Sequence, residues 1–287
     1  MKGVCIMYKN QLIRSCIVSF PILLLLTSCV EVVNITGHNP WRGIPNSELI
    51  VAVHMRQTGK VRSILKKRPE LVDLEVQGET PLEVAAINHD VEIAKILLDH
   101  GADVNRRLTG FSTMGPTPLH EALSRARSRD KDPYDTVVLL LDHGADINLL
   151  EQGYTVLHLA ARGSSVRVLE LLHARGAAVD ARTPEGWTPL MTAASKGWYA
   201  GVRYFLENGA DPLAVNQRGD TALFEANFTL HNLERRGNLP EMSKEMRRIA
   251  ARLNEPDLAE KTREARRVVA LLKEHEERKK KEREGAQ

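Results

Sequence analysis

The residues of this sequence that could hold a metal ion or act in acid–base chemistry are its ten histidines. Imidazole is a common metal ligand and the usual general base near pH 7. The histidines nevertheless recur at fixed positions: His120 and His158 are each the fourth residue of a Thr-x-Leu-His stretch, while His100 and His143 each precede a glycine. Equivalent positions in stacked helices lie about 10 Å apart, too far for two imidazoles that must each approach a zinc ion to about 2 Å. We therefore expect structural histidines and no metal site.

No other stretch has the spacing of an active site. The sequence contains no Gly-x-Ser-x-Gly nucleophile motif, no phosphate-binding glycine loop and no His-Glu-x-x-His zinc motif. It also contains no pair of carboxylates at a spacing that suits acid–base catalysis. The formal net charge of +3 on 287 residues gives no electrostatic reason to expect nucleic-acid binding. The sequence therefore predicts a protein that is not an enzyme and has no catalytic residues and no cofactor.

The N-terminus has the composition of an export signal. All three cysteines lie within the first 29 residues, and residues 1–28 contain three basic residues, no acidic ones and the apolar stretch 16–26. This is the anatomy of a secretory signal, and the stretch is shorter than the roughly 20 apolar residues of a transmembrane helix. Residues 26–29 (LTSC) resemble the lipobox of bacterial lipoproteins. The resemblance implies cleavage between Ser28 and Cys29 and lipid attachment to Cys29.

The lipobox also implies a location. Cleavage would leave residues 29–46 as a lipidated tether that contains Asn, Gly and Pro, with a reach of at most about 60 Å. We expect the protein in the bacterial cell envelope, anchored to a membrane by the lipid on Cys29. Val30 stands where an aspartate would retain an enterobacterial lipoprotein at the inner membrane. By that analogy, the outer membrane or the periplasmic side is favoured.

Beyond the tether, the sequence repeats itself. The tripeptide Gly-x-Thr recurs at intervals of 37, 38, 33 and 33 residues, as GET (78–80), GPT (115–117), GYT (153–155), GWT (186–188) and GDT (219–221). The stretches between these tripeptides end in sequences of the type LLDHGAD. A single unit of this length cannot bury its apolar face alone, so the units are expected to stack.

These stretches resemble the ankyrin repeat, whose period is about 33 residues and whose units carry a Thr-Pro-Leu-His stretch. The resemblance implies an all-α solenoid of about six helix–turn–helix units, with β-hairpin-like fingers connecting them and a helical C-terminal cap. It covers residues 47–230, more weakly in the first unit, with units near 47–77, 78–114, 115–152, 153–185, 186–218 and from 219 onward.

The recurrent residues have local roles in such a unit. Thr80 and its equivalents can cap a helix N-terminus, and Pro81 then occupies the first helical position, where a missing N–H costs nothing. Pairs such as Ala193-Ala194 keep the first helix thin, so that neighbouring units can pack closely. Gly101 and its equivalents follow the second helix, where a residue in the left-handed conformation ends it.

The C-terminal part, residues 231–287, is less regular. Residues 219–228 predict the first helix of a last unit, whose partner is postponed to residues 263–275. Residues 241–254 predict an added amphipathic helix that covers the open end of the stack, with its apolar face formed by Met242, Met246, Ile249 and Leu253. The charged residues beyond 275 are expected to form a frayed, solvated helix end.

In the ankyrin family, finger tips and first helices form a concave side that binds other proteins. The residue between Gly and Thr belongs to that side by resemblance, and in two adjacent units it is Tyr154 and Trp187. Large aromatic side chains dominate binding hot spots, but the same two residues could instead brace the fingers, and both interpretations stay open. The candidate protein-binding residues are Arg106, Arg107, Phe111, Met114, Leu149, Leu150, Tyr154 and Trp187.

The sequence thus predicts a membrane-anchored protein–protein interaction scaffold of the bacterial envelope. We expect it to be monomeric, to bind another envelope protein and to bind no nucleic acid. One alternative is a structural envelope lipoprotein that contacts lipid or polymer through its basic patches. Another is a cytosolic ankyrin protein with an uncleaved N-terminal anchor.

Overall fold

The computed structural model describes four stretches of the chain, residues 44–107, 115–124, 132–237 and 258–285. Internal contacts divide the chain into two units, residues 1–45 and 46–287, and all the described helices belong to the second. The signal peptide, Ser28 and Cys29 lie outside the described residues, so their roles stay predictions.

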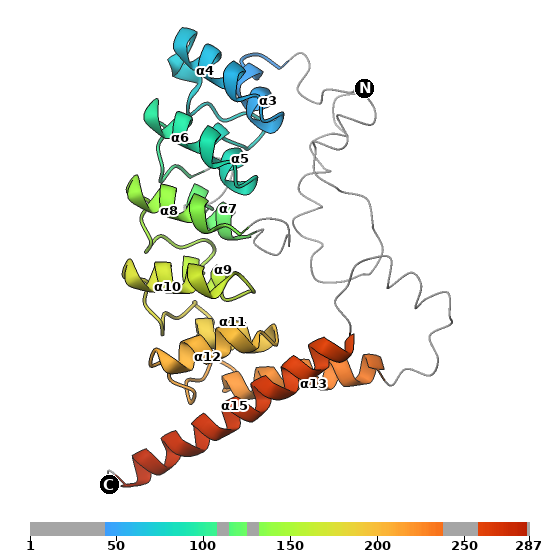
Figure 1. Ribbon diagram of the computed structural model, residues 1–287. Helices are drawn as coiled ribbons and strands as arrows, with labels where there is room; N and C mark the ends of the chain where they lie inside the picture. Colours follow the sequence, from blue (N-terminus) through green and yellow to red (C-terminus); the bar gives the residue numbers. More distant parts are fainter. Residues whose placement is uncertain (1–43, 108–114, 125–131, 238–257, 286–287) are drawn as a thin grey trace, which may run out of the picture. The chain divides into compact units, whose positions relative to one another are not determined.

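Consecutive helix pairs make up the described part of the second unit (Figure 1). Each first helix packs against the second helix that follows it. The predicted all-α solenoid is confirmed, since these residues form helices and no strands. The pairs are α3 (Glu48–His54) with α4 (Thr58–Lys67), α5 (Pro81–Ile87) with α6 (Val91–Asp99), α7 (Pro118–Ser124) with α8 (Tyr134–Asp142), α9 (Val156–Ala160) with α10 (Val166–Ala174), α11 (Pro189–Ser195) with α12 (Tyr199–Glu207), and α13 (Ala222–Gly237) with α15 (Leu258–Gly285).

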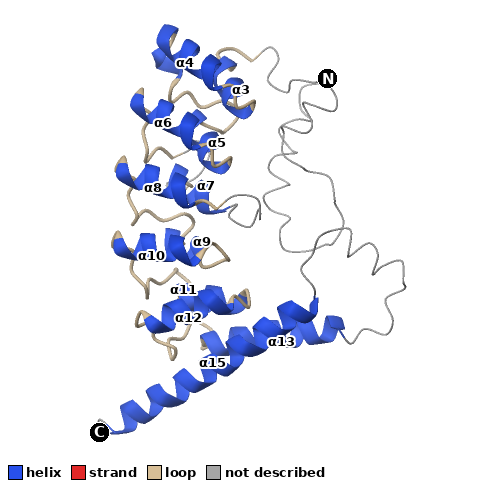
Figure 2. Ribbon diagram, viewed as in Figure 1, coloured by secondary structure: helices blue, strands red, loops and turns tan. Residues whose placement is uncertain are grey.

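The pairs stack into two layers, as Figure 2 shows. Each first helix, from α3 to α13, contacts the first helix of the next pair, and the second helices form a parallel row that ends on α15. Paired alanines such as Ala193-Ala194 are fully buried in the first layer. Large side chains at equivalent positions of four second helices have no exposure, namely Leu97, Leu140, Leu172 and Phe205. The periodic apolar residues therefore form one continuous core between neighbouring units.

The predicted helix caps are confirmed. Thr80, Thr155 and Thr188 are each in an extended conformation, and each side chain accepts a hydrogen bond from the backbone N–H three residues later. Pro81 and Pro189 occupy the first helical positions. The cap satisfies one of the N–H groups that the start of a helix leaves without a partner. The direction of these three first helices is therefore fixed by the finger that precedes each of them.

The fingers are closed by isolated backbone pairs instead of strands. Single antiparallel bridges join Val76 to Glu79 and Glu151 to Tyr154. In the next finger, the N–H of Thr183 donates to the carbonyl of Trp187 at 3.0 Å. A turn this tight leaves room for one bridge only, which explains why β-hairpin-like fingers form without β-strands in the described residues.

The last helix pair has longer helices than the other pairs, and the end of its first helix contacts the start of its second. Glu234, near the end of α13, pairs with Arg266 near the start of α15 at 2.8 Å. Thr221, just before α13, donates to Glu276 of α15 at 3.1 Å. The two helices are therefore antiparallel. The predicted amphipathic helix 241–254 lies outside the described residues.

Helix α15 extends at both ends beyond the predicted residues 263–275. Its last turns are mostly exposed and carry ion pairs one turn apart, such as Lys280 with Glu276 at 3.7 Å, which favour a helix in water. Arg283 also reaches Asp211 of the preceding unit at 3.2 Å. Within the described residues, no helix has the combination of length and hydropathy that crossing a membrane requires.

Two glycines test how closely the fingers pack. Gly153 has a φ of +84°, and a Cβ added to it would lie 2.3 Å from Cδ of Pro184 in the next finger. Gly101 has a φ of +87° and only open space around it. We expect Gly101→Ala to cost about 1–2 kcal/mol of unfolding free energy through backbone strain alone, and Gly153→Ala to cost about 2–4 kcal/mol because a clash adds to the strain. Urea unfolding measures both. Equal losses would contradict the finger packing.

Candidate protein-binding surface

A pocket of about 320 Å³ opens between the fourth and fifth helix pairs. It lies between the finger that precedes α9, the end of α9, Trp187 of the next finger and one face of α11. The predicted pair Tyr154 and Trp187 therefore line one site. The lining residues are Glu151, Gln152, Tyr154, Leu159, Arg162, Trp187, Thr192, Ser195 and Lys196.

Tyr154 is both braced and accessible. Its backbone is paired with that of Glu151 at 2.8 and 3.0 Å. Its ring meets the ring of His158 edge to face, with the centroids 5.9 Å apart. The side chain still keeps 37% of its surface exposed, whereas Trp187 is half-buried. Because bracing holds the Tyr154 ring without covering it, the two interpretations of this residue do not exclude each other.

His158 connects one helix pair to the next finger. Its Nδ1 accepts from the hydroxyl and the N–H of Thr155, at 2.8 and 3.4 Å, which places the ring proton on Nε2. Nε2–H donates to the carbonyl of Trp187 at 3.0 Å. His120 donates in the same way to the carbonyl of Leu149 at 3.0 Å. Burial lowers the pKa of each imidazole to about 4, so both are neutral near pH 7.

The second and fifth pairs use other residues at this position. In α5, Oε2 of Glu83 accepts from the N–H and the hydroxyl of Thr80, both at 3.0 Å, which closes the cap. Its Oε1 is buried and has no hydrogen-bond partner within the described residues. Burial is the largest cause that raises the pKa of Glu83, to about 7. In α11 the position is Met191, which cannot donate to a carbonyl.

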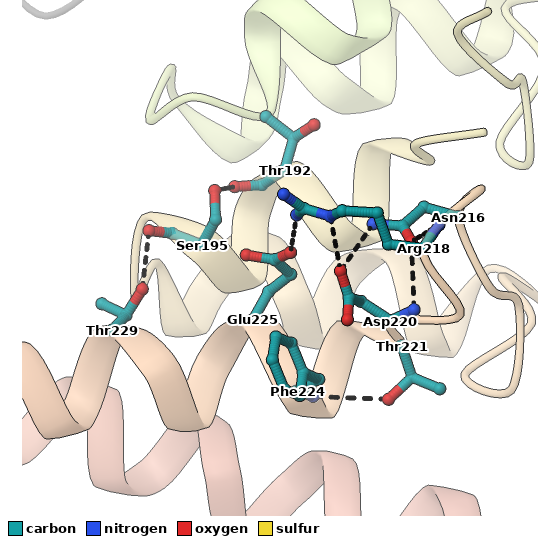
Figure 3. Close-up of polar contacts among 9 residues, drawn as sticks. All are labelled: Thr192, Ser195, Asn216, Arg218, Asp220, Thr221, Phe224, Glu225 and Thr229. Carbon is teal, nitrogen blue, oxygen red and sulfur yellow. Dashed lines mark hydrogen bonds and ion pairs between the residues drawn. The ribbon is translucent and has the colours of Figure 1, made fainter. Parts of the chain in front are cut away.

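The rear wall of the pocket is fastened to the next helix pair (Figure 3). The hydroxyl of Ser195 donates to the carbonyl of Thr192 at 2.9 Å, and the hydroxyl of Thr229 in α13 donates to the carbonyl of Ser195 at 3.0 Å. The end of α11 is thus hydrogen-bonded to α13. This side of the pocket is therefore formed by a helix that is hydrogen-bonded to the next helix pair.

The finger that precedes α13 is held by ion pairs, whereas the two fingers before it carry an aromatic residue at the corresponding position. Asp220 corresponds in sequence to Tyr154 and Trp187. It accepts from Arg218 at 2.8 Å, and Arg218 also pairs with Glu225 at 3.2 Å (Figure 3). Burial raises the pKa of Glu225, against the effect of the Arg218 charge. Tyr154 and Trp187 therefore belong to the fingers that precede α9 and α11, and the finger that precedes α13 has no aromatic residue at this position.

The other predicted residues have different surroundings. Arg107 donates to the carbonyls of Gly115 and Leu150, at 3.3 and 3.1 Å, so its guanidinium holds neighbouring fingers together. Arg106 is half-buried, and its Nε has no partner among the described residues. Leu149 is half-buried and Leu150 is 37% exposed. Phe111 and Met114 lie outside the described residues.

Sequence reasoning missed the basic residues of the pocket. Lys196 stands directly after α11 and Arg162 two residues after the end of α9, and both residues are exposed. The binding residues predicted from the sequence lie in the fingers, whereas Arg162 and Lys196 lie just beyond the far ends of two first helices. The repeat register contained the signal, because Arg162 follows an alanine pair and aligns with Ser195 one period later.

The architecture defines a class of protein. The described residues form a stacked helix-pair solenoid with a pocket on its finger side, and proteins of this class use their extended surfaces to hold other proteins. Within the described residues, no group of three or more His, Cys, Asp or Glu side chains could hold a metal ion.

The family model for ankyrin repeats matches in three copies, over residues 24–108, 49–151 and 157–232, which together cover more than half of the chain. The chain belongs to the ankyrin-repeat family. Repeats of this family typically serve as non-enzymatic interaction modules.

Curated relatives share the repeats over part of their length. An ankyrin repeat protein of Rickettsia bellii is 43% identical over 60 residues, which are 21% of this chain and 23% of that protein. Ankyrin repeat and SOCS box protein 16 of Homo sapiens is 37% identical over 145 residues, 50% of this chain and 30% of that protein. Ankyrin repeat and KH domain-containing protein mask-1 of Caenorhabditis elegans is 32% identical over 197 residues, 59% of this chain and 7% of that protein. The chain thus spans less than a third of each of these relatives.

The histidine link predicts a pH dependence of stability. In His158→Met, which copies the natural Met191, the carbonyl of Trp187 loses its donor, and we expect a loss of about 1–3 kcal/mol of unfolding free energy at about pH 7.5. The folded pKa of about 4 lies below the ordinary 6.5, so the contribution of His158 is present above pH 6.5 and is lost as the pH falls to 4. The difference between wild type and variant should therefore shrink by up to about 3 kcal/mol over that range.

Urea unfolding at several pH values between about 4 and 7.5 measures this difference. The contribution of Glu83 to the free energy of unfolding depends on pH in the opposite direction. Because its pKa is raised, this contribution is present below pH 4.5 and is lost as the pH rises through about 7. That contribution is common to both proteins and cancels in the difference. A difference that stays constant with pH would show that His158 does not carry the link.

Proposed function

We propose that the chain is a membrane-anchored scaffold that binds a protein partner on the finger side of its ankyrin stack. One observation carries the proposal: two large aromatic side chains, Tyr154 and Trp187, line a single pocket between two stacked units. Aromatic anchors in a partly desolvated pocket supply most of the free energy at protein interfaces. Hydrogen bonds to the carbonyls of Trp187 and Ser195 also hold residues around the pocket in place, and preorganisation of this kind lowers the entropic cost of association.

The rigidity of the site supports binding over bracing alone. Trp187 is positioned through its carbonyl by His158, and the wall behind it is held by Thr229. Neither contact uses the indole or the exposed part of the Tyr154 side chain. The exposed part of Tyr154 is therefore available to a partner.

The first test replaces the aromatic pair. In Tyr154→Ala/Trp187→Ala we expect capture of the partner to weaken by roughly thirtyfold for each side chain, the effect of a hot-spot residue. The measurement compares the proteins that wild type and variant retain from envelope extracts, quantified by mass spectrometry. Thermal unfolding of both proteins is recorded in parallel and should change little.

Val215→Ala is the matched control, because Val215 is an apolar finger residue that is 46% exposed and does not line the pocket. It should retain the partner as wild type does. If the double variant retains every protein that wild type retains, the proposed binding surface is wrong. If capture falls only in step with stability, the aromatic pair braces the fingers.

The proposal places the scaffold at a membrane through Cys29. Its support is the lipobox-like stretch 26–29 that follows a basic and then an apolar segment. Residues 29–46 would then act as the tether between the lipid and α3. A single anchored cysteine suits a protein that must hold its partner near a membrane surface.

Cys29→Ala tests the anchor. Wild type should be processed between Ser28 and Cys29 and should fractionate with membranes and incorporate labelled lipid, whereas the variant should keep its signal and carry no label. Intact mass of the N-terminus and membrane fractionation provide the readouts. A wild-type chain that is unprocessed and unlabelled would refute the lipoprotein assignment and leave the aromatic surface to be judged on its own test.

A further inference from the structure

The pocket between the fourth and fifth helix pairs is lined by both aromatic and cationic side chains. Tyr154 and Trp187 give part of its lining an aromatic surface, whereas Arg162 and Lys196 supply two cations. Glu151 is the one carboxylate among the lining residues, so the lining carries a net positive charge. Complementary charge on a partner improves both the encounter rate and the choice of partner. The lining therefore favours an anionic group beside an apolar one.

Arg162 is the cation best placed to select that group. It follows the C-cap of α9 and is exposed. Within the described residues, none of the ion pairs or side-chain hydrogen bonds involves its guanidinium. A guanidinium presents a planar fork of donors that matches a carboxylate with two parallel hydrogen bonds. The chain thus holds an exposed carboxylate-binding group beside its aromatic pocket and uses it for no contact of its own there.

The hydroxyls of the wall determine what the rest of the ligand must offer. Thr192 donates its proton to the carbonyl of Thr188 at 3.2 Å, and Ser195 donates its proton to the carbonyl of Thr192 at 2.9 Å. Each hydroxyl has one proton, so toward the pocket both can only accept. The backbone N–H groups of an extended peptide are the complementary donors.

We propose, on the basis of the protein-binding function above, that this pocket binds an extended segment of the partner with a side-chain carboxylate next to an aromatic or branched apolar residue. The carboxylate pairs with Arg162, with Lys196 adding positive charge, and the apolar side chain packs against Tyr154 and Trp187. The volume of about 320 Å³ suits one large side chain with its neighbours, because it stands at the lower end of the range for ligand pockets.

A charge reversal tests the proposal directly. The full-length chain, immobilised through a tag after Gln287, is used to select from a random peptide library displayed internally on phage. Wild type should enrich peptides with Asp or Glu beside an aromatic or branched apolar residue. Arg162→Glu should lose these peptides and enrich Lys or Arg in their place. Arg203→Gln, an exposed arginine of α12 outside the pocket, should select as wild type does.

A double-mutant cycle then measures the contact itself. The best enriched peptide is synthesised with its acid intact and with that acid changed to the amide. In wild type the change should weaken binding roughly tenfold, as expected for a hydrogen bond to a charged group. In Arg162→Gln it should have less than about a twofold effect, because the partner charge is already absent.

The outcomes separate this inference from the function on which it rests. If wild type and Arg162→Glu enrich the same peptides, or the cycle shows no coupling, the acidic preference is wrong while the aromatic pocket stands. If Tyr154→Ala/Trp187→Ala selects the same peptides as wild type, or wild type enriches none above that variant, both the inference and the proposed binding surface fail.

Discussion

The threonine that precedes α5, α7, α9 and α11, together with the residue three positions later, forms the contact on which the rest of the stack depends. Thr155 caps α9 and also fixes the ring of His158, which crosses to the backbone of the next finger. A local interaction that starts a helix thereby becomes a link between units. Because that link spans neighbouring units only, the stack requires no long-range pairing to place its fingers. Two of the histidines that first suggested metal or acid–base chemistry, His120 and His158, make this link.

Variation at that one position makes the units different from one another. A histidine reaches forward in the third and fourth pairs, while Glu83 keeps its carboxylate within its own cap and Met191 makes no polar link. The pocket lies where a histidine link is present and where the fingers on both sides carry an aromatic residue. Within the described residues, hydrogen-bonded support and accessible aromatic side chains therefore coincide between the fourth and fifth pairs, and this coincidence supports the proposal that a partner binds there.

Most of the stack could be predicted from the sequence because its determinants are local. Thr80 with Pro81 marks a helix start, and Gly101 marks a helix end, through backbone geometry that depends on few neighbours. Fewer residues of the candidate site could be predicted in this way. Its aromatic half was found because Tyr154 and Trp187 occupy equivalent positions, but Arg162 and Lys196 join them only through the packing of two units. Likewise, the sequence placed Arg107 at a finger tip and could not indicate that its guanidinium would be used on neighbouring carbonyls.

The antiparallel closure of α13 by α15 has a consequence for the order in which the protein is completed. Links within the stack join residues about one period apart, such as the 29 residues between His120 and Leu149. The contacts of α15 span 55 residues, from Thr221 to Glu276, and 72 residues, from Asp211 to Arg283. The early pairs can thus fold one after another during synthesis, whereas these contacts of the final pair require residues that are synthesised 55 to 72 positions later. A chain interrupted before α15 would carry correctly formed repeats with an uncovered last layer, and proteolysis would distinguish it from a chain that includes α15.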